Sequence, residues 1–184
     1  MAKTEAFSRE PSMIETDRLL ALSTDDVERD FAAALAPFIQ NAYGGRRSLQ
    51  WPTPMAYLLS HGQFWAPVPL PACIVHGAPT ACFTNAWKTV QTQPDLRYAE
   101  GYGYNPDLGI PIEHAWCIDS AGRVLDPTWR DATRCRYFGA IFPPKAVVQI
   151  QALTGVYGIL DGSTWRSVEP LLEAMAQQPN ALPA

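Results

Sequence analysis

Three residues of this chain, a cysteine, a histidine and an aspartate, have the types and the order needed for nucleophilic catalysis by a thiol. Cys82 opens a short helical pattern, and the amino end of a helix favours a reactive thiolate. His114 and Asp126 lie in residues 112–129, a pattern typical of a β-hairpin. Such a hairpin can place a base and the group that orients it on adjacent strands. We therefore expect Cys82 to be the nucleophile, His114 the general base and acid, and Asp126 the orienter.

The hairpin must close in one register for this chemistry to work. Side chains alternate along a strand, so His114 shares its face with Trp116. If residues 119–123 close as a three-residue loop with Gly122 in the left-handed conformation, Asp126 opposes Trp116. His114 and Asp126 are then diagonal neighbours, about 7 to 8 Å apart at the backbone. A slip of one residue would send Asp126 to the other face.

An oxyanion formed at the substrate carbonyl would need hydrogen-bond donors near the thiol. The main-chain amide of Cys82 is the first candidate, because amides in the first turn of a helix lack partners. We expect Thr80 to cap this helix, which the pattern extends from about residue 81 to residue 90. Two side chains could supply a second donor: Gln63, which lies upstream of the thiol, and Asn85.

Other cysteines and histidines have weaker cases for catalysis. Cys73 and Cys117 are expected in the core, and Cys135 lies between two arginines that could lower its pKa but has no obvious base. His61 and His76 each precede a glycine and are expected in turns.

Four further acidic residues lie near these motifs. Asp119 and Asp131 compete with Asp126 as the orienter, but Asp119 fits the hairpin turn and Asp131 fits the loop after it. Glu100 and Glu113 could act as specificity carboxylates. The simpler expectation is that both are exposed strand charges.

Aromatic residues could line a substrate groove. Tyr98, Tyr102 and Tyr104 share one face of a strand, and with Trp87 they form either a wall for substrate or a packed sheet, which is the simpler interpretation. The two tryptophans of the hairpin region are either core residues or groove residues. The groove candidates are Trp87, Tyr102, Trp116 and Trp129.

The elements that must position these residues can be read from local patterns. We expect helices over 25–37, 55–61 and 167–176, a strand over 97–104, and short strands or turns over 138–142 and 146–150. Helices followed by an antiparallel sheet predict an α+β fold. Residues 1–184 are expected to form a single domain, with loose ends over 1–12 and 177–184.

Composition narrows the classes of function. A net charge of −4 and a pI of about 5.3 disfavour nucleic-acid binding, and no apolar run approaches the ~20 residues needed to span a bilayer. The four cysteines lack the close spacing of a zinc site, so we expect free thiols and no metal. Without a signal peptide, a cytoplasmic location is the default expectation. Oligomeric state does not follow from these residues.

The order and the residues of these motifs resemble those of the papain-like superfamily, specifically its transglutaminase-like branch in bacteria and phages. That branch places a Cys at a helix start, then His and Asp on successive strands. The similar sequence motifs in this chain are His114-Ala115-Trp116 followed by Asp126-Pro127-Thr128. The resemblance covers about residues 79 to 142. Two features depart from the papain pattern: Phe83 follows Cys82 where Trp is usual, and Gln63 lies farther upstream than the usual oxyanion glutamine.

This resemblance implies a papain/transglutaminase-like fold with N-terminal helices packed on a small antiparallel sheet, and it implies no cofactor. The expected function is a cysteine-dependent hydrolase that cleaves an amide or peptide bond, or transfers the acyl group, through a Cys-His-Asp triad. Its substrate would be a peptide, a protein or a small amide. One alternative is a non-catalytic protein- or ligand-binding module on the same fold. Another is a redox or structural role for the four cysteines.

Overall fold

The computed structural model describes residues 11–43 and 50–176, in which helices are combined with an antiparallel half-barrel sheet. The expected loose ends fall mostly outside these ranges. Pro11 and Ser12, which we expected in the loose N-terminal end, instead begin a helix. The mixed α+β class predicted from the sequence is confirmed.

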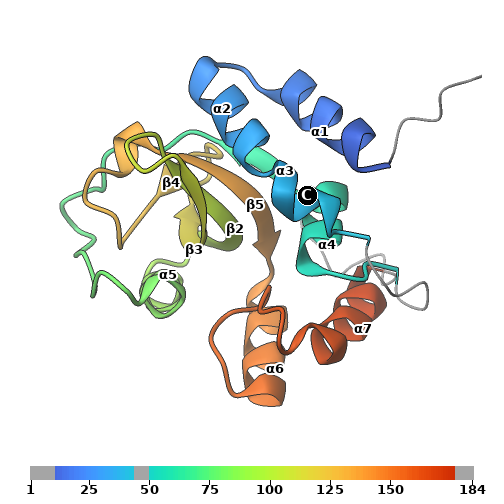
Figure 1. Cartoon of the computed structure of the whole chain (residues 1–184). Helices are drawn as coiled ribbons and strands as arrows, with labels where there is room; N and C mark the ends of the chain where they lie inside the picture. The colour runs from blue at the N-terminus through green and yellow to red at the C-terminus, as the bar shows by residue number, and fades with distance from the viewer. Residues whose placement is uncertain (1–10, 44–49, 177–184) are drawn as a thin grey trace, which may run out of the picture.

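Five antiparallel strands form the sheet in the order β1-β5-β2-β3-β4 (Figure 1). Their bounds are β1 Gln63–Trp65, β2 Arg97–Asn105, β3 Ile110–Ile118, β4 Val124–Leu125 and β5 Arg136–Phe142. The predicted hairpin register is confirmed, because Cys117 pairs with Leu125 and Ile118 with Val124. Gly122 adopts a φ of 75°, the left-handed conformation that this turn requires.

The two ends of the sheet are joined by the segment that follows β1. The amide of Val124 in β4 donates to the carbonyl of Ala66 at 3.2 Å, and its carbonyl accepts from the amide of Val68 at 3.0 Å. Because this segment leaves β1 at one edge and reaches β4 at the other, the sheet curls into a half-barrel. The sheet therefore has an enclosed face and an outer face, and His114 belongs to the enclosed one.

Aromatic rings fill the enclosed face, where the backbone carries small residues. Trp65 and Trp116 meet edge to face at 5.8 Å, and Trp116 lies 5.0 Å from Tyr137. A Cβ atom on Gly139 would lie 2.7 Å from the Trp116 ring, which is closer than real contacts allow. Glycine in the strand therefore makes room for the ring.

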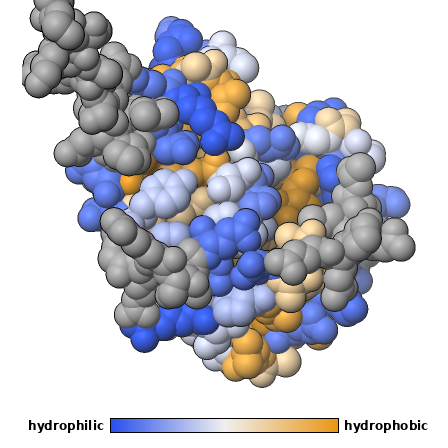
Figure 2. All heavy atoms as spheres, turned by 90° about the vertical axis from the view of Figure 1, so that its right-hand side faces the viewer, coloured by the Kyte–Doolittle hydropathy of each residue, from blue (hydrophilic) through white to orange (hydrophobic). Residues whose placement is uncertain are grey.

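Helices cover the outer face of the sheet. In chain order they are α1 Pro11–Leu22, α2 Asp26–Ala34, α3 Ala36–Gln40, α4 Pro54–His61, α5 Cys82–Thr92, α6 Pro144–Thr154 and α7 Trp165–Ala176, with the short 3-10 turn η1 Ala132–Arg134 before β5. In Figure 1, α1 to α4 lie above and to the right of the sheet, α6 and α7 below, and α5 at the lower left. Helix α5 packs on β3 and β2, while α2 and α4 contact β5. On the face that Figure 2 shows, hydrophilic and hydrophobic residues are interspersed.

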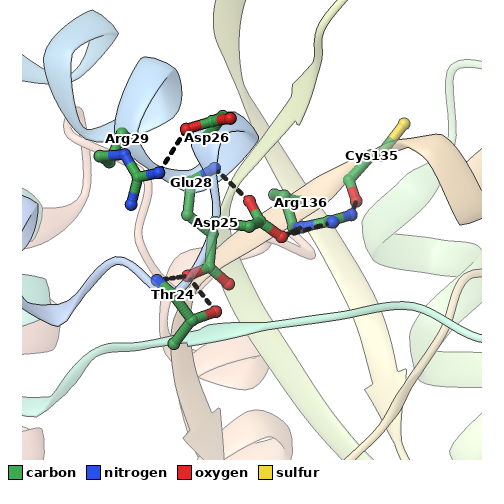
Figure 3. A network of polar contacts seen from close by, with 7 residues as sticks. All are labelled: Thr24, Asp25, Asp26, Glu28, Arg29, Cys135 and Arg136. Atoms are coloured by element: carbon green, nitrogen blue, oxygen red, sulfur yellow. Dashed lines mark hydrogen bonds and ion pairs between the residues drawn. The ribbon is translucent and has the colours of Figure 1, made fainter.

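Helix α2 is fixed to the sheet through its amino-terminal cap, drawn in Figure 3. Asp25 accepts the amide of Glu28 at 2.8 Å, and Glu28 in turn accepts the amide and hydroxyl of Thr24. The other Asp25 oxygen accepts two hydrogen bonds from the Arg136 guanidinium of β5, at 3.0 and 2.6 Å. This single carboxylate therefore caps the helix and links it to the strand.

Most of the elements predicted from local patterns are present. Helices lie over 26–34, 54–61 and 165–176, and a strand lies over 97–105. The expectation of a strand or turn at 146–150 was wrong, because these residues belong to α6. Within the described residues, no helix is long and apolar enough to cross a membrane.

Candidate active site

His114 and Asp126 form a buried hydrogen-bonded pair on the enclosed face of the half-barrel. The Nε2 atom of His114 lies 2.8 Å from Oδ2 of Asp126, and the two residues are 2% and 1% exposed. The register places Asp126 one residue beyond β4, diagonal to His114 in β3. The side chains that the hairpin was predicted to bring together are therefore in contact.

Asp126 is held from three further directions. Its Oδ1 accepts the main-chain amides of Thr128 at 2.7 Å and Trp129 at 3.1 Å, and its Oδ2 also accepts the Tyr137 hydroxyl at 2.7 Å. Tyr137 was missed by the sequence analysis, because the expected strand began one residue after it. Only the register of β5 against β2 reveals that Tyr137 faces the same side as His114.

These contacts set the charge of the pair. Burial alone would lower the pKa of His114, but hydrogen bonds and charge interactions with Asp126 and Cys82 raise it to about 9. Burial would raise the pKa of Asp126, yet the hydrogen bond and charge of His114, followed by the Tyr137 hydroxyl, hold it below its usual value. At neutral pH the pair is therefore an imidazolium and a carboxylate.

Cys82 is the first residue of α5 and is partly exposed. The predicted cap by Thr80 is wrong: the residue before the helix is Ala81, and no side chain caps this end. Asp25 and Thr53, by contrast, cap α2 and α4 with their side chains. The first-turn amides of α5 are therefore left without a capping side chain, beside the thiol where an oxyanion would form.

The imidazole of His114 bridges the thiol and the carboxylate. A hydrogen bond with Cys82 contributes to the raised pKa of His114, and Nε2 is already directed at Asp126. The ring nitrogen available to Cys82 is therefore Nδ1. The three predicted residues thus line up as thiol, imidazole and carboxylate.

Asn85, one turn after Cys82, anchors the loop that leads into α5. Its amide group donates to the carbonyl of Ala78 at 2.8 Å and to the hydroxyl of Thr128 at 3.0 Å. The amide of Gly77 also donates to the carbonyl of Pro127 at 2.8 Å. Because both hydrogens of Asn85 are used in these bonds, the structure gives Asn85 a positioning role in place of the predicted oxyanion role.

Gln63, the other predicted oxyanion donor, is not brought to the thiol. Gln63 in β1 pairs with Gly139 in β5. Gly139 pairs in turn with Gly101 in β2, and Gly101 pairs with His114 in β3. Measured along the curved sheet, three strand spacings correspond to about 14 Å. The Gln63 side chain is exposed and lines a different cavity, together with Arg97.

The four groove candidates have different surroundings. Trp129 stacks on His114 with ring centroids 4.1 Å apart and covers the imidazole. Trp116 is fully buried in the half-barrel, and Trp87 packs edge to face on Tyr98 in the main core, so neither can contact a substrate at the surface. Tyr102, although largely buried, lines a cavity beside the thiol.

Several expectations for the competing residues need correction. Cys73 is exposed and not in the core, whereas Cys117 is buried as expected. Burial raises the pKa of Cys135 to about 12, opposite to the lowering that its arginine neighbours suggested. Glu100 is fully buried, while Glu113 is exposed as predicted.

The two competing histidines and Asp131 do not take part in the hydrogen-bonded pair. His61 ends α4, where its Nδ1 lies 3.1 Å from the carbonyl of Tyr57, and His76 lies in the loop before α5. Asp131 precedes the turn η1. Across 11–43 and 50–176, no group of three or more His, Cys, Asp or Glu is placed to hold a metal ion.

A cavity of about 370 Å³ opens at the start of α5, next to Cys82, although Cys82 itself does not line it. Its walls include the residues on either side of the thiol, Ala81 and Phe83, together with Glu113 of β3 and the segment 156–161. A cavity of this size lies within the range of small-molecule sites. A substrate could therefore enter next to the thiol.

Comparisons with protein-family models, with curated proteins and with solved structures gave no match to this chain.

Proposed function

We propose that this protein is a cysteine-dependent hydrolase or acyltransferase that acts on an amide or peptide bond. The observation that carries the proposal is the buried His114–Asp126 pair, whose imidazolium faces Cys82 at the uncapped start of α5. A cation beside a thiol and a helix amino terminus both stabilise the thiolate. No resident cofactor is needed for this chemistry.

In the proposed first half-reaction, the Cys82 thiolate attacks the carbonyl carbon of the substrate. The carbonyl oxygen becomes an oxyanion, which the main-chain amide of Cys82 can stabilise. As this intermediate collapses, the carbon–nitrogen bond breaks and His114 donates its proton to the leaving amine. A thioester between the acyl group and Cys82 remains.

In the second half-reaction, His114 is neutral and acts as a base. It takes a proton from water, and the resulting hydroxide attacks the thioester to release a carboxylic acid. An amine in place of water would yield a new amide by the same route. Asp126 keeps the imidazole oriented through Nε2 in both steps.

We further propose that the fold is papain/transglutaminase-like. The supporting features are a nucleophile at the start of a helix that packs on β3, a histidine in β3, and an aspartate just after β4. The curled antiparallel sheet is consistent with the same assignment. A peptide, a protein or a small amide is the substrate class that this assignment favours.

The test is alkylation of the folded protein with limiting iodoacetamide from pH 5 to pH 9, followed by peptide mapping. Cys73, which is exposed, serves as a reference thiol within the same chain. At pH 6 we expect Cys82 to react at least about 10-fold faster than Cys73, since the imidazolium of His114 favours its thiolate. In His114→Gln, whose fold is checked by circular dichroism, this advantage should disappear.

Equal reactivity of Cys82 and Cys73 in the folded wild-type protein would rule out an activated thiol. The alternative, a non-catalytic binding module on the same fold, would then be favoured. If Cys82 is activated, turnover of nitrophenyl esters and anilides by wild type but not by Cys82→Ala would support the enzyme.

A further inference from the structure

We infer that the cavity beside Cys82 binds a positively charged side chain of the substrate, and that Glu113 selects it. This inference rests on the proposed function, since it assigns the substrate class of the same site. It begins with position: Ala81 and Phe83, which flank the nucleophile, both line the cavity. A group held in the cavity would therefore belong to the residue whose carbonyl is attacked, or to its immediate neighbour.

The walls of the cavity have the chemistry of a pocket for a lysine or arginine side chain. Apolar surface comes from Leu58, Phe83 and Leu160, which can contact an aliphatic stem. Carboxylates come from Glu100, Glu113 and Asp161, and no lysine or arginine is present among the described lining residues. An apolar stem with a cationic end fits these walls.

Of the three carboxylates, Glu113 is the one whose side chain accepts no hydrogen bond from another residue in the described part of the chain. Glu100 already accepts the Tyr98 hydroxyl and the amides of residues 159 and 160. Asp161 accepts the amide and hydroxyl of Ser163 at 2.7 and 2.5 Å. No hydrogen bond or ion pair of the Glu113 side chain is found within the described part of the chain. Although this residue is exposed, the partial burial of its carboxylate, followed by the charge of Asp161, raises its pKa. A ligand cation would relieve that unfavourable charge interaction.

Glu113 also lies at a junction between two depressions of the surface. A second cavity, of about 350 Å³, is lined by Phe38 and Met55 and shares Tyr102 and Glu113 with the first. The rings of Phe38 and Tyr102 lie 5.1 Å apart. A substrate longer than one residue could thus continue from the thiol past Glu113 toward α3, which favours a peptide over a small amide.

Binding is tested first, independently of catalysis. Titrations of Cys82→Ser with two blocked tripeptides, one with a central lysine and one with a central norleucine, are followed by NMR. We expect the lysine peptide to bind at least about 10-fold more tightly, because the two differ in the ammonium group. The Glu113→Gln substitution should abolish this preference. Asp95→Asn, which changes the net charge equally at an exposed turn beyond the other end of α5, should keep it.

Equal binding of the two peptides, or a lysine preference that survives in Glu113→Gln, would overturn the inference. Catalysis is scored separately with the nitrophenyl esters of blocked lysine and norleucine on wild-type protein. Acylation of Cys82 by both esters without a lysine preference would contradict the pocket but leave the proposed function intact. Lysine-selective binding without any acylation of Cys82 would support the pocket and contradict the proposed function.

Discussion

Asp126 controls what His114 can do, because its four hydrogen bonds leave the carboxylate one orientation. Two come from the main-chain amides of Thr128 and Trp129, one from the Tyr137 hydroxyl and one from His114 itself. An ionised carboxylate can accept all four. The proton on Nε2 of His114 is therefore fixed, and Nδ1 is left to exchange a proton with Cys82.

Replacing Asp126 with asparagine should reverse this tautomer preference. The amide oxygen can still accept the two main-chain amides, but the amide nitrogen would then face His114 and donate to Nε2. Neutral His114 would carry its proton on Nδ1, so it could not accept the Cys82 proton. We expect alkylation of Cys82 at pH 6 to fall by about 10²-fold or more in Asp126→Asn. Peptide mapping against Cys73 measures it, and an unchanged rate would contradict the orienting role.

The same variant tests the pH dependence of stability that the pair predicts. Folding raises the pKa of His114 from 6.5 to about 9. His114 therefore contributes to the free energy of unfolding in full below pH 6.5, and this contribution is lost as the pH rises through 9. At ~1.4 kcal/mol per pKa unit this loss is about 3 kcal/mol. Urea unfolding at pH 6 and pH 9 should show it in wild type and a smaller loss in Asp126→Asn. Equal losses in both proteins would assign the pH dependence to other groups.

Strand β2 makes room for the site at Gly103, a position without a side chain. Gly103 faces the imidazole, and a Cβ atom there would lie 2.6 Å from Cη2 of Trp129 and 3.4 Å from Cδ2 of His114. The stacking of Trp129 on His114 therefore depends on a strand position without a side chain.

Gly103→Ala should displace the Trp129 ring and disturb the imidazole beneath it. We expect a loss of about 1 to 3 kcal/mol in unfolding free energy, typical of overpacking, and a slower reaction of Cys82. Gly162→Ala is the matched control, because a Cβ atom there meets nothing within 4 Å. Urea unfolding and alkylation rates report the two effects, and a Gly103→Ala protein as stable and reactive as the control would contradict this account.

Elements whose information is local were predictable from the sequence. The β3–β4 hairpin is one: the turn residues fix its register, Asp119 accepts the amides of Ala121 and Arg123, and the register fixes the His114–Asp126 pair. Helix α6 was missed because Val147, Val148 and Ile150 favour a strand by residue type. Signals for a helix were nevertheless present, with Pro144 in its first turn and Gly155 in the left-handed conformation after its last.

Contacts between distant parts of the chain could not be predicted in this way. Glu169 of α7 accepts the amide of Trp51, and the Trp51 carbonyl accepts the indole N–H of Trp165, across more than a hundred residues in each case. The position of Gln63 shows the same limit, because only the strand order reveals that it lies three strands away from His114. Residue order suggested the triad, whereas the topology decides which further residues join it.

Glu100 connects the sheet to the C-terminal part of the molecule and lines the cavity beside Cys82. The carboxylate lies in β2 and accepts the Tyr98 hydroxyl at 2.5 Å, as well as the amides of Ile159 and Leu160 at 2.8 to 3.0 Å. Since residues 156–161 form one wall of the cavity, the shape of the site depends on this buried carboxylate. The burial of Glu100 could not be predicted from an alternation of buried and exposed side chains along β2, because both faces of this strand are covered.

Burial raises the pKa of Glu100 from 4.5 to about 7, against the hydrogen bond from Tyr98 and those from the two amides, which lower it. The nearby charge of Glu113 acts in the same direction as burial. Because its pKa is higher in the folded than in the unfolded protein, Glu100 contributes to the free energy of unfolding in full below pH 4.5. This contribution is lost as the pH rises through 7. The loss should amount to about 3 kcal/mol at ~1.4 kcal/mol per pKa unit.

Glu100→Gln removes this titration while keeping the shape of the side chain, since its amide oxygen can still accept main-chain amides. Urea unfolding of wild type between pH 5 and pH 7 should therefore show a loss that Glu100→Gln lacks, after the titrations common to both proteins cancel. Asp95→Asn, an exposed substitution of equal charge, should follow wild type. If Glu100→Gln and wild type lose the same free energy over this range, Glu100 is ionised throughout it, and the link between β2 and residues 159–160 is a permanent ionic anchor.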